Sequence, residues 1–200
     1  MREDNPTIYF ATGNKGKFVE ATHIAKVFGI TLKQIKSEKI EIQSDELEDI
    51  ASFAAKCASE TTRRSVLAED AGLFVNSLQG FPGPYSAYVF KTLGINGVLT
   101  LLKGARDRGA SFRAVVSFVR PRSSPVSFDG EVIGVITRKP RGTLGFGFDP
   151  IFTPIQGDGR TFAEMDTLEK NRLSHRAKAF VKFFTWFSMH ETSSSPRQVK

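Results

Sequence analysis

The sequence predicts an α/β fold built on a mixed β-sheet. In the first half of the chain, short apolar runs alternate with amphipathic helical patterns. Residues 112–120 and 126–137 then alternate between apolar and polar side chains and are rich in β-branched residues. They flank Arg122-Ser-Ser-Pro125, and this arrangement is typical of an antiparallel hairpin. A terminal segment, 167–187, keeps its apolar side chains at helical spacing. Alternating strands and helices, a hairpin and a closing helix together indicate a mixed sheet.

The remaining elements follow from the same patterns. Strands are expected at 7–12, 31–35 and 66–68, with 73–75 extending the last, and helices at 16–28, 46–62, 86–92 and 95–103. In the first helix Lys17, Glu20, His23 and Lys26 follow the polar side, so we expect them at the surface.

Cys57 is the one cysteine of the chain, so it cannot form an internal disulfide. It lies on the apolar stripe Ile50, Phe53, Ala54, Cys57 and Ala58, which predicts a buried structural thiol.

The composition indicates a single domain that works in the cytoplasm. The 200 residues are 40% hydrophobic, which is enough for a core, and their 18 phenylalanines predict an aromatic-rich interior. No apolar stretch approaches the ~20 residues of a membrane span, and the N-terminus lacks the apolar region of a signal peptide. We expect one domain over 1–190 and a disordered polar tail over 191–200.

The net charge of +7 fits either a nucleic-acid partner or a polyanionic small ligand. Acids and prolines are interspersed among the basic residues, so the charge does not form one continuous stripe.

A short segment after the first strand has the features of a phosphate-binding turn. It consists of Thr12, Gly13, Asn14, Lys15, Gly16 and Lys17. A turn of this kind leaves N–H groups free at a helix N-terminus, where the helix dipole favours an anion. It is not a Walker A loop, which has four residues between its glycines and a Ser or Thr after its Lys. From the segment alone, a plain turn with solvated lysines is equally compatible.

Carboxylates follow the strand predicted at 66–68. Glu69 and Asp70 are expected at its C-terminal end, and Glu41 lies on an isolated extended piece, residues 40–42. Ligand sites of α/β sheets lie beyond the carboxyl ends of strands. Carboxylates there suit Mg²⁺, which takes oxygen ligands together with substrate phosphates. The alternative is an acidic surface turn.

A glycine-rich segment provides candidate contacts to a flat ligand. Three glycines fall within the six positions from Gly142 to Gly147, and they allow close approach of the backbone. Phe146 or Phe148 is suited to stack on a base, and Asp149 to accept a hydrogen bond from its edge. A glycine-rich hairpin with core aromatics is the alternative interpretation.

A basic cluster opens the terminal helical segment. Lys170, His175 and Arg176 are typical of an anion or keto-oxygen site near a helix start, although a solvated helix start is the commoner case. In one straight helix Lys170 and Arg176 would lie roughly 240° apart around the axis. We therefore predict a break near Ser174, which would let both serve one site.

Taken together, these motifs resemble the Ham1-like inosine triphosphate pyrophosphatases, in the same order and from about residue 7 to 187. The matching segments are Thr12-x-Asn14-x-x-Lys17, Glu69–Leu73, Gly80–Ser86, Gly145–Pro150, Phe162–Met165 and Glu169–Arg176. The resemblance implies an elongated mixed sheet flanked by helices, with two lobes around a central substrate cleft, in a homodimer.

The resemblance also implies an activity and a set of roles. The family hydrolyses ITP, dITP and XTP to the monophosphate and pyrophosphate with Mg²⁺, which removes these nucleotides from the pool. The triphosphate contacts would be Thr12, Gly13, Asn14, Lys15, Gly16 and Lys17. Asp70 would be the catalytic carboxylate and, with Glu41 and Glu69, a metal ligand. The base contacts would be Phe146, Gly147, Phe148, Asp149, Lys170, His175 and Arg176.

Two positions depart from the family pattern. Phe148 stands where Tyr or Trp is common, so stacking is retained but a hydrogen bond from a phenol or indole is lost. Ala71 stands where Ser or Thr often follows the catalytic Asp, so only a backbone contact to substrate is expected there.

Two alternatives stay open at the level of sequence. One is a related house-cleaning pyrophosphatase that acts on modified pyrimidine or standard triphosphates, which the purine-type base motif disfavours. The other is a non-enzymatic nucleotide or nucleic-acid binding module, which has no need of Glu41, Glu69 and Asp70 beside a phosphate turn. The sequence thus predicts a purine nucleotide substrate, and neither a nucleic-acid nor a membrane partner. It leaves open the preference among ITP, dITP and XTP and the group that excludes GTP.

Overall fold

The computed structural model describes residues 5–35 and 42–191. Its strands are β1 Thr7–Ala11, β2 Thr31–Ile35, β3 Val66–Val75, β4 Pro82–Gly83, β5 Gly109–Val119, β6 Val126–Ile136 and β7 Phe152–Pro154. Its α-helices are α1 Lys15–Val27, α2 Leu47–Thr62, α3 Ser86–Thr92, α4 Gly94–Leu101, α5 Thr167–Asn171 and α6 His175–Glu191. Short 3₁₀ turns cover Asn76–Leu78, Asp149–Ile151 and Phe162–Glu164.

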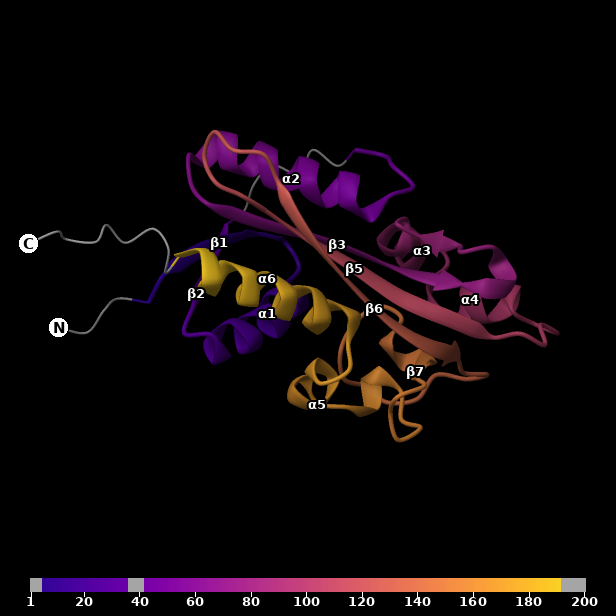
Figure 1. The fold of residues 1–200 in the computed structure, drawn as a ribbon. Helices are drawn as coiled ribbons and strands as arrows, with labels where there is room; N and C mark the ends of the chain where they lie inside the picture. Colours follow the sequence, from indigo (N-terminus) through magenta and orange to yellow (C-terminus); the bar gives the residue numbers. More distant parts are fainter. Residues whose placement is uncertain (1–4, 36–41, 192–200) are drawn as a thin grey trace, which may run out of the picture.

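The strands of the described residues form one mixed sheet of seven, in the order β2-β1-β3-β5-β6-β7, with β4 paired to β3. β1 runs parallel to β2 and β3, whereas β5 runs antiparallel to both of its neighbours, β3 and β6. Helix α2 covers one face of β3 and β5, α6 covers the other face over β5 and β6, and α1 lies beside α6 against β2 (Figure 1). The predicted mixed α/β sheet flanked by helices is confirmed.

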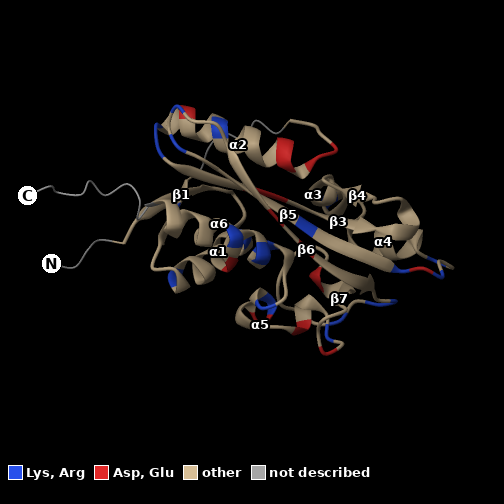
Figure 2. Cartoon of the chain, in the orientation of Figure 1, with Lys and Arg blue, Asp and Glu red and all other residues tan. Residues whose placement is uncertain are grey.

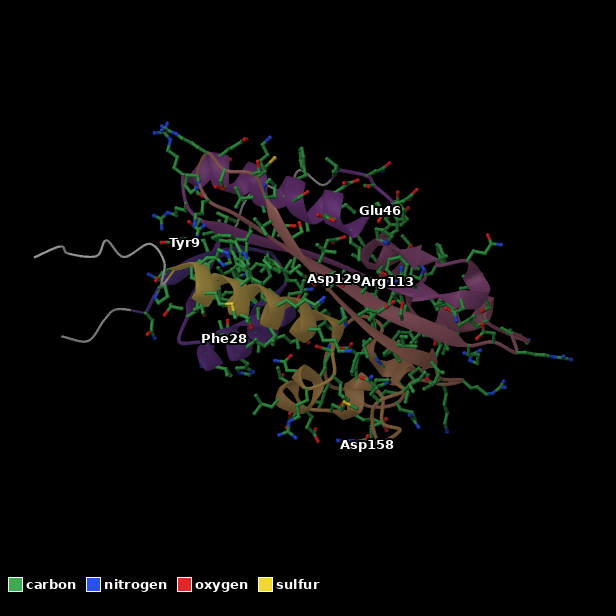
Figure 3. All side chains as sticks on the ribbon, in the orientation of Figure 1. Tyr9, Phe28, Glu46, Arg113, Asp129 and Asp158 are labelled. Carbon is green, nitrogen blue, oxygen red and sulfur yellow. The ribbon has the colours of Figure 1, made fainter. Side chains whose placement is uncertain are left out.

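Among the described residues, charges of both signs are spread over both ends of the molecule, and the basic ones form no continuous stripe in this view (Figure 2). Exposed ion pairs join Arg113 to Glu131 and Lys182 to Asp129 at 2.8 Å each. Arg113 and Asp129 are labelled in Figure 3. No helix within the described ranges is both long and apolar enough to cross a membrane.

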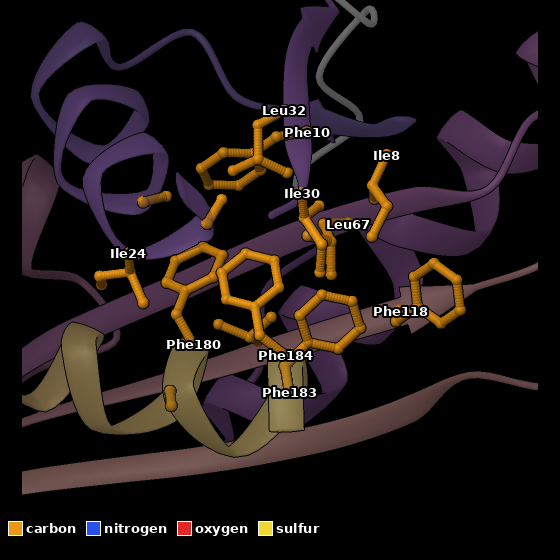
Figure 4. Close-up of a cluster of buried hydrophobic side chains, with 14 of the residues drawn as sticks. Ile8, Phe10, Ile24, Ile30, Leu32, Leu67, Phe118, Phe180, Phe183 and Phe184 are labelled. Atoms are coloured by element: carbon orange, nitrogen blue, oxygen red, sulfur yellow. The ribbon is translucent and has the colours of Figure 1, made fainter. Parts of the chain in front are cut away.

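The two larger hydrophobic cores of the described residues lie at opposite ends of β3 and β5. The first packs the aromatic face of α6 against α1, β1, β3 and β5 (Figure 4). Its members include Ile8, Phe10, Leu67, Phe118, Phe180, Phe183 and Phe184. The second lies beside α3, α4 and β7, and includes Leu73, Val98, Phe112, Phe152 and Phe162. Since β3 and β5 contribute to both cores, they join two lobes into one sheet.

The middle of β3 has an open edge. Its pairing with β1 ends at Leu67, and β4 pairs with it only at Leu73 and Phe74. Over residues 68–72, β5 lies on one edge, and the other edge faces no strand of the described chain. The prediction that Glu69 and Asp70 follow the end of a strand is therefore wrong. The parallel pairing ends before them, but the antiparallel pairing with β5 carries the strand on to Val75.

Two predictions about helix faces are also wrong. Glu20 of α1 is only 4% exposed, because it has buried cationic partners. In α2 the buried face is Leu47, Ala51, Ala55, Ala58 and Ser59, whereas Cys57 is half-buried. The apolar stripe of α2 is wide, and its small residues Ala54 and Ala55 pack against Ala68 and Val119 of the sheet.

The break predicted near Ser174 is confirmed. Helix α5 ends at Asn171, α6 begins at His175, and the Ala177 N–H donates to Ser174 Oγ at 3.2 Å. Helix α6 includes Glu191, the first residue of the predicted tail, and residues 192–200 lie outside the described residues. Glu41 lies outside them as well.

Candidate active site

A cavity of about 630 Å³ opens along the free edge of β3. Its walls come from the Thr12–Lys17 turn, α2, the middle of β3, residues 84–90, the glycine-rich loop and the start of α6. It therefore lies between the two lobes and brings together segments that are far apart in the sequence.

The predicted phosphate turn is tied to the N-terminus of α1. Asn14 is the N-cap, and its Oδ1 accepts the Lys17 N–H at 3.1 Å. The Asn14 N–H in turn donates to Thr12 Oγ1 at 3.1 Å. Thr12, Asn14 and Lys17 line the cavity, whereas Lys15 is exposed. Gly13 and Gly16 shape the turn without lining the cavity.

Glu69 and Asp70 point to opposite faces of β3, because side chains alternate along a strand. Glu69 shares the face of Leu67, which packs against α6, and its side chain is fully buried. Asp70 shares the face of Ala68, which packs against Ala55 of α2. Both residues line the cavity, from its two sides.

A chain of buried ion pairs extends from the phosphate turn to the glycine-rich loop. Lys17 Nζ lies 2.7 Å from Glu69 Oε2, and Arg176 Nε lies 3.0 Å from Glu69 Oε1. Arg176 Nη1 and Lys170 Nζ lie 2.6 and 2.8 Å from the two oxygens of Glu20. Lys170 Nζ also lies 2.6 Å from Asp149 Oδ2. We call these six residues the buried circuit: Lys17, Glu69, Arg176, Glu20, Lys170 and Asp149.

The carboxyl groups of the buried circuit differ in their pKa values. Burial favours the neutral acid in Glu20 and Glu69, but the cations around each outweigh it, Arg176 foremost, and lower both pKa values. For Asp149, burial dominates over Lys170 and raises the pKa. Glu20 and Glu69 are therefore charged at neutral pH and hold Arg176 between them.

The glycine-rich loop is folded around Asp149. Asp149 Oδ2 accepts the Phe146 N–H at 2.8 Å, and Gly145 has a φ of +71°, which favours glycine. The Phe146 ring lies against Gly16, where an added Cβ would come within 2.5 Å of Phe146 Cδ1. The glycine-rich loop thus packs directly on the phosphate turn.

Phe148 lies deeper than Phe146 in the same loop. It is 3% exposed, and its ring packs edge-on against that of Phe90, with ring centroids 5.4 Å apart. Phe146, Gly147, Phe148 and Asp149 line the cavity, whereas Lys170 does not. The partly exposed Phe146 is the better placed of the two aromatic rings for stacking on a base.

His175 presents a neutral ring at the same end of the cavity. It is 2% exposed and stacks on Phe112, with ring centroids 4.8 Å apart and planes at 11°. Burial, and then the nearby Arg176 and Lys170, hold the pKa of His175 well below its usual value. Its Nδ1 is buried and has no hydrogen-bond partner among the described residues. A neutral imidazole offers one donor and one acceptor, which suits recognition of a base edge.

The described residues fit Mg²⁺ that arrives with a triphosphate. Across 5–35 and 42–191, no group of three His, Cys, Asp or Glu side chains is placed to hold a metal. Mg²⁺ usually binds one or two carboxylates plus substrate phosphates and water, so a dedicated protein cage is not required. Asp70 lines the same cavity as the phosphate turn and meets that need, whereas both oxygens of Glu69 face cations.

Several residues of the site were not predicted from the sequence. Glu20 binds Lys170 and Arg176, which lie 150 and 156 residues further along the chain, and its spacing of three from Lys17 was the one available signal. Ile50, Ala54 and Cys57 of α2 form an apolar wall of the cavity in place of core. Phe112 supports His175 from β5.

Comparison with known proteins agrees with this arrangement. Residues 8–186 match the Ham1 family. The chain belongs to the Ham1 family. The resemblance found in the sequence motifs is therefore confirmed over nearly the whole described chain.

Among the relatives of this Ham1 chain are two archaeal proteins named dITP/XTP pyrophosphatase. That of Methanopyrus kandleri is 47% identical over 180 residues, covering 90% of this chain and 95% of its own. That of Saccharolobus solfataricus is 51% identical over 172 residues, covering 86% and 88%.

Solved structures of Ham1 proteins share the fold. The Coxiella burnetii protein aligns with a TM-score of 0.80 at 31% identity, over 92% of this chain and 99% of its own. The Staphylococcus aureus protein aligns with a TM-score of 0.79 at 29% identity, over the same shares.

Proposed function

We propose that this protein is a nucleoside triphosphate pyrophosphohydrolase that cleaves the non-standard purine nucleotides ITP, dITP and XTP. The observation that carries the proposal is the cavity itself, which Asp70 and the phosphate turn line together with His175 and Arg176. Relatives at 47% and 51% identity that bear the name dITP/XTP pyrophosphatase support it.

The reaction is an in-line displacement at the α-phosphorus. Asp70 accepts a proton from a water whose oxygen bonds to that phosphorus, and the bond to the bridging oxygen of the β-phosphate breaks. The products are the nucleoside monophosphate and pyrophosphate. Lys17 and the N–H groups at the start of α1 stabilise the charge on the departing pyrophosphate.

We propose Mg²⁺ as the metal, held by Asp70 and the phosphate oxygens, with Glu41 as a further ligand from outside the described residues. When bound, the ion neutralises phosphate charge. In this proposal Glu69 acts by holding Lys17 and Arg176 in place, because its two oxygens already face these cations.

Selectivity follows from the donors at the base end. A 6-keto purine presents an acceptor at C6, whereas adenine presents a donor. Arg176 is a donor in every protonation state reached by the protein, so the amino group of ATP would face a donor. Each unpaired buried group costs ~1–3 kcal/mol, which corresponds to about 5- to 150-fold per mismatch.

We also propose that the protein acts as a homodimer in the cytoplasm. Exposed Tyr85, Tyr88 and Phe90, which also line the cavity, and the neighbouring Leu93 offer an apolar surface at the edge of the cavity for a second copy. A single cysteine, which cannot form an internal disulfide, is compatible with a reducing compartment.

A substrate panel tests the proposal. Pyrophosphate and inorganic phosphate are measured separately with ITP, dITP, XTP, GTP, ATP and a pyrimidine triphosphate, with Mg²⁺ and with chelator. We expect pyrophosphate from ITP, dITP and XTP, at rates at least about tenfold above those of ATP and GTP, and only with metal. Equal rates with ATP and GTP, or preference for the pyrimidine, would overturn it.

A further inference from the structure

Glu20 lies behind the cavity and holds two of the side chains at its base end. It is not among the residues that line the cavity, and its side chain is 5% exposed. Its Oε1 accepts from Lys170 and its Oε2 from Arg176. Whatever Glu20 contributes to the site must therefore act through these two cations.

From Arg176, the contacts lead to the phosphate turn. Arg176 uses Nη1 for Glu20 and Nε for Glu69, so one guanidinium joins two carboxylates. Glu69 passes the connection to Lys17, whose 18% exposed side chain is the least buried of the circuit. Lys17 lies one helical turn before Glu20 on α1, so the contacts return to the helix where they began.

From Lys170, the contacts lead to the glycine-rich loop and return to α1. Asp149 joins Lys170 Nζ to the Phe146 N–H, and the Phe146 ring rests on Gly16. Lys170 Nζ and Arg176 Cζ lie 4.8 and 5.2 Å from the centroid of that ring. The base end and the phosphate end are thus joined along both branches, and the branches meet at Glu20.

The charges of the circuit balance, with three carboxylates against three cations. Each carboxylate oxygen of Glu20 is already paired with one cation, so Glu20 has no unused acceptor oxygen. Removing the charge of Glu20 leaves Lys170 and Arg176 next to each other with one carboxylate each. Their new positions must then shift Asp149 on one side and Glu69 on the other.

We propose that Glu20 is a positioning residue that couples recognition of the base to binding of the triphosphate. The inference rests on the proposed function, because it assigns these two ligand halves to the two ends of the cavity. A base that engages Arg176 and Phe146 fixes Lys17 through Glu69, while Glu20 holds Arg176 in place, and a bound triphosphate fixes Arg176 in return. Such coupling is reciprocal by thermodynamic necessity.

Equilibrium binding of the two substrate halves tests this directly. Inosine and inorganic tripolyphosphate are titrated calorimetrically into the whole protein in Mg²⁺ buffer, each alone and each with the other saturating. For the unaltered protein we expect each ligand to raise the affinity of the other by about fivefold or more. In Glu20→Gln we expect both factors to fall to within about twofold of one. The matched control Glu131→Gln removes the same charge from an exposed ion pair and should keep the full coupling.

The outcomes separate the inference from the function on which it rests. Independent binding of the two halves in the unaltered protein, or full coupling in Glu20→Gln, overturns the inference. If a melting curve shows that Glu20→Gln is unfolded, Glu20→Asp replaces it. That variant keeps the charge but shortens its reach, so we expect intermediate coupling, and unchanged coupling overturns the inference. Hydrolysis of ITP is measured in parallel: hydrolysis without coupling removes only the inference, and coupling without hydrolysis removes only the proposed function.

Discussion

Glu69 and Asp70 are neighbours in β3, yet they lie on opposite faces of the sheet. Glu69 is fully buried between Arg176 and Lys17, and Asp70 faces the α2 side of the cavity. A one-residue step along a strand reverses the direction of the side chain. Removing the charge of Asp70 should therefore affect turnover, whereas removing the charge of Glu69 should affect stability.

Replacing Asp70 with Asn should abolish chemistry and leave the fold intact. A positioned base contributes about 10²–10⁴-fold, so we expect turnover of ITP to fall by at least that much. Asp129→Asn, a change at an exposed position on β6, should keep full turnover. Thermal melts show whether both variants fold, and near-normal turnover in Asp70→Asn would remove this residue from the mechanism.

Replacing Glu69 with Gln should instead destabilise the protein. Breaking a buried ion pair by neutralising one partner costs about 3–5 kcal/mol, and here it leaves Arg176 and Lys17 short of an anion. Glu131→Gln breaks an exposed pair and should cost about 0–1 kcal/mol. Denaturant unfolding of both variants measures the difference, and equal stabilities would contradict the buried role of Glu69.

Adding a methyl group at Gly16 should disturb the packing of Phe146. The new Cβ would lie 2.5 Å from the ring, and overpacking of this kind costs about 1–3 kcal/mol. Gly13→Ala is the matched control, since an added Cβ there meets nothing within 4 Å. Combining Gly16→Ala with Phe146→Ala should remove the penalty. A penalty that persists in the double variant would show that the strain lies elsewhere.

Removing Oγ from Ser174 should weaken the start of α6. Ser174 Oγ accepts the Ala177 N–H, and loss of such a cap costs about 0.5–2 kcal/mol. Thr100→Ala, at an exposed position within α4, should change the stability little. Urea unfolding compares the two, and equal effects would argue against Ser174 as the cap.

His175 should make stability depend on pH below neutrality. Burial lowers the pKa of His175 in the folded state, so as the pH falls the unfolded chain binds a proton at this residue before the folded protein does. The sign follows: its contribution is complete above the unfolded pKa of about 6.5 and is lost as the pH falls from there towards the folded pKa. Between pH 7.5 and 5.5, the protein should therefore lose more of its free energy of unfolding than His175→Phe does. Parallel losses in the two proteins would contradict a buried neutral His175.

Local patterns in the sequence were enough for much of the fold. The hairpin of β5 and β6 follows from alternation, and the break between α5 and α6 follows from Ser174 and from the need to bring Lys170 and Arg176 together. Both depend on residues close together in the chain, where short-range periodicity and capping decide the structure.

Long-range partners account for what the sequence did not reveal. Helical periodicity places Glu20 with the polar side chains, and only contact with Lys170 and Arg176 makes its burial possible. Pairing with β5 carries β3 past Glu69, although its parallel partner β1 has already ended. The cavity beside α2 likewise turns Cys57 from expected core into a wall residue.

Hydrolysis of an equimolar mixture of ITP and ATP in ¹⁸O-labelled water, with Mg²⁺, tests the central claim most directly. Mass spectrometry of the products locates the attacked phosphorus and the selected base in one measurement. The account predicts inosine monophosphate carrying one ¹⁸O, unlabelled pyrophosphate, and ATP that is largely intact. Label in pyrophosphate or in inorganic phosphate, or labelled AMP formed as fast as labelled inosine monophosphate, would contradict it.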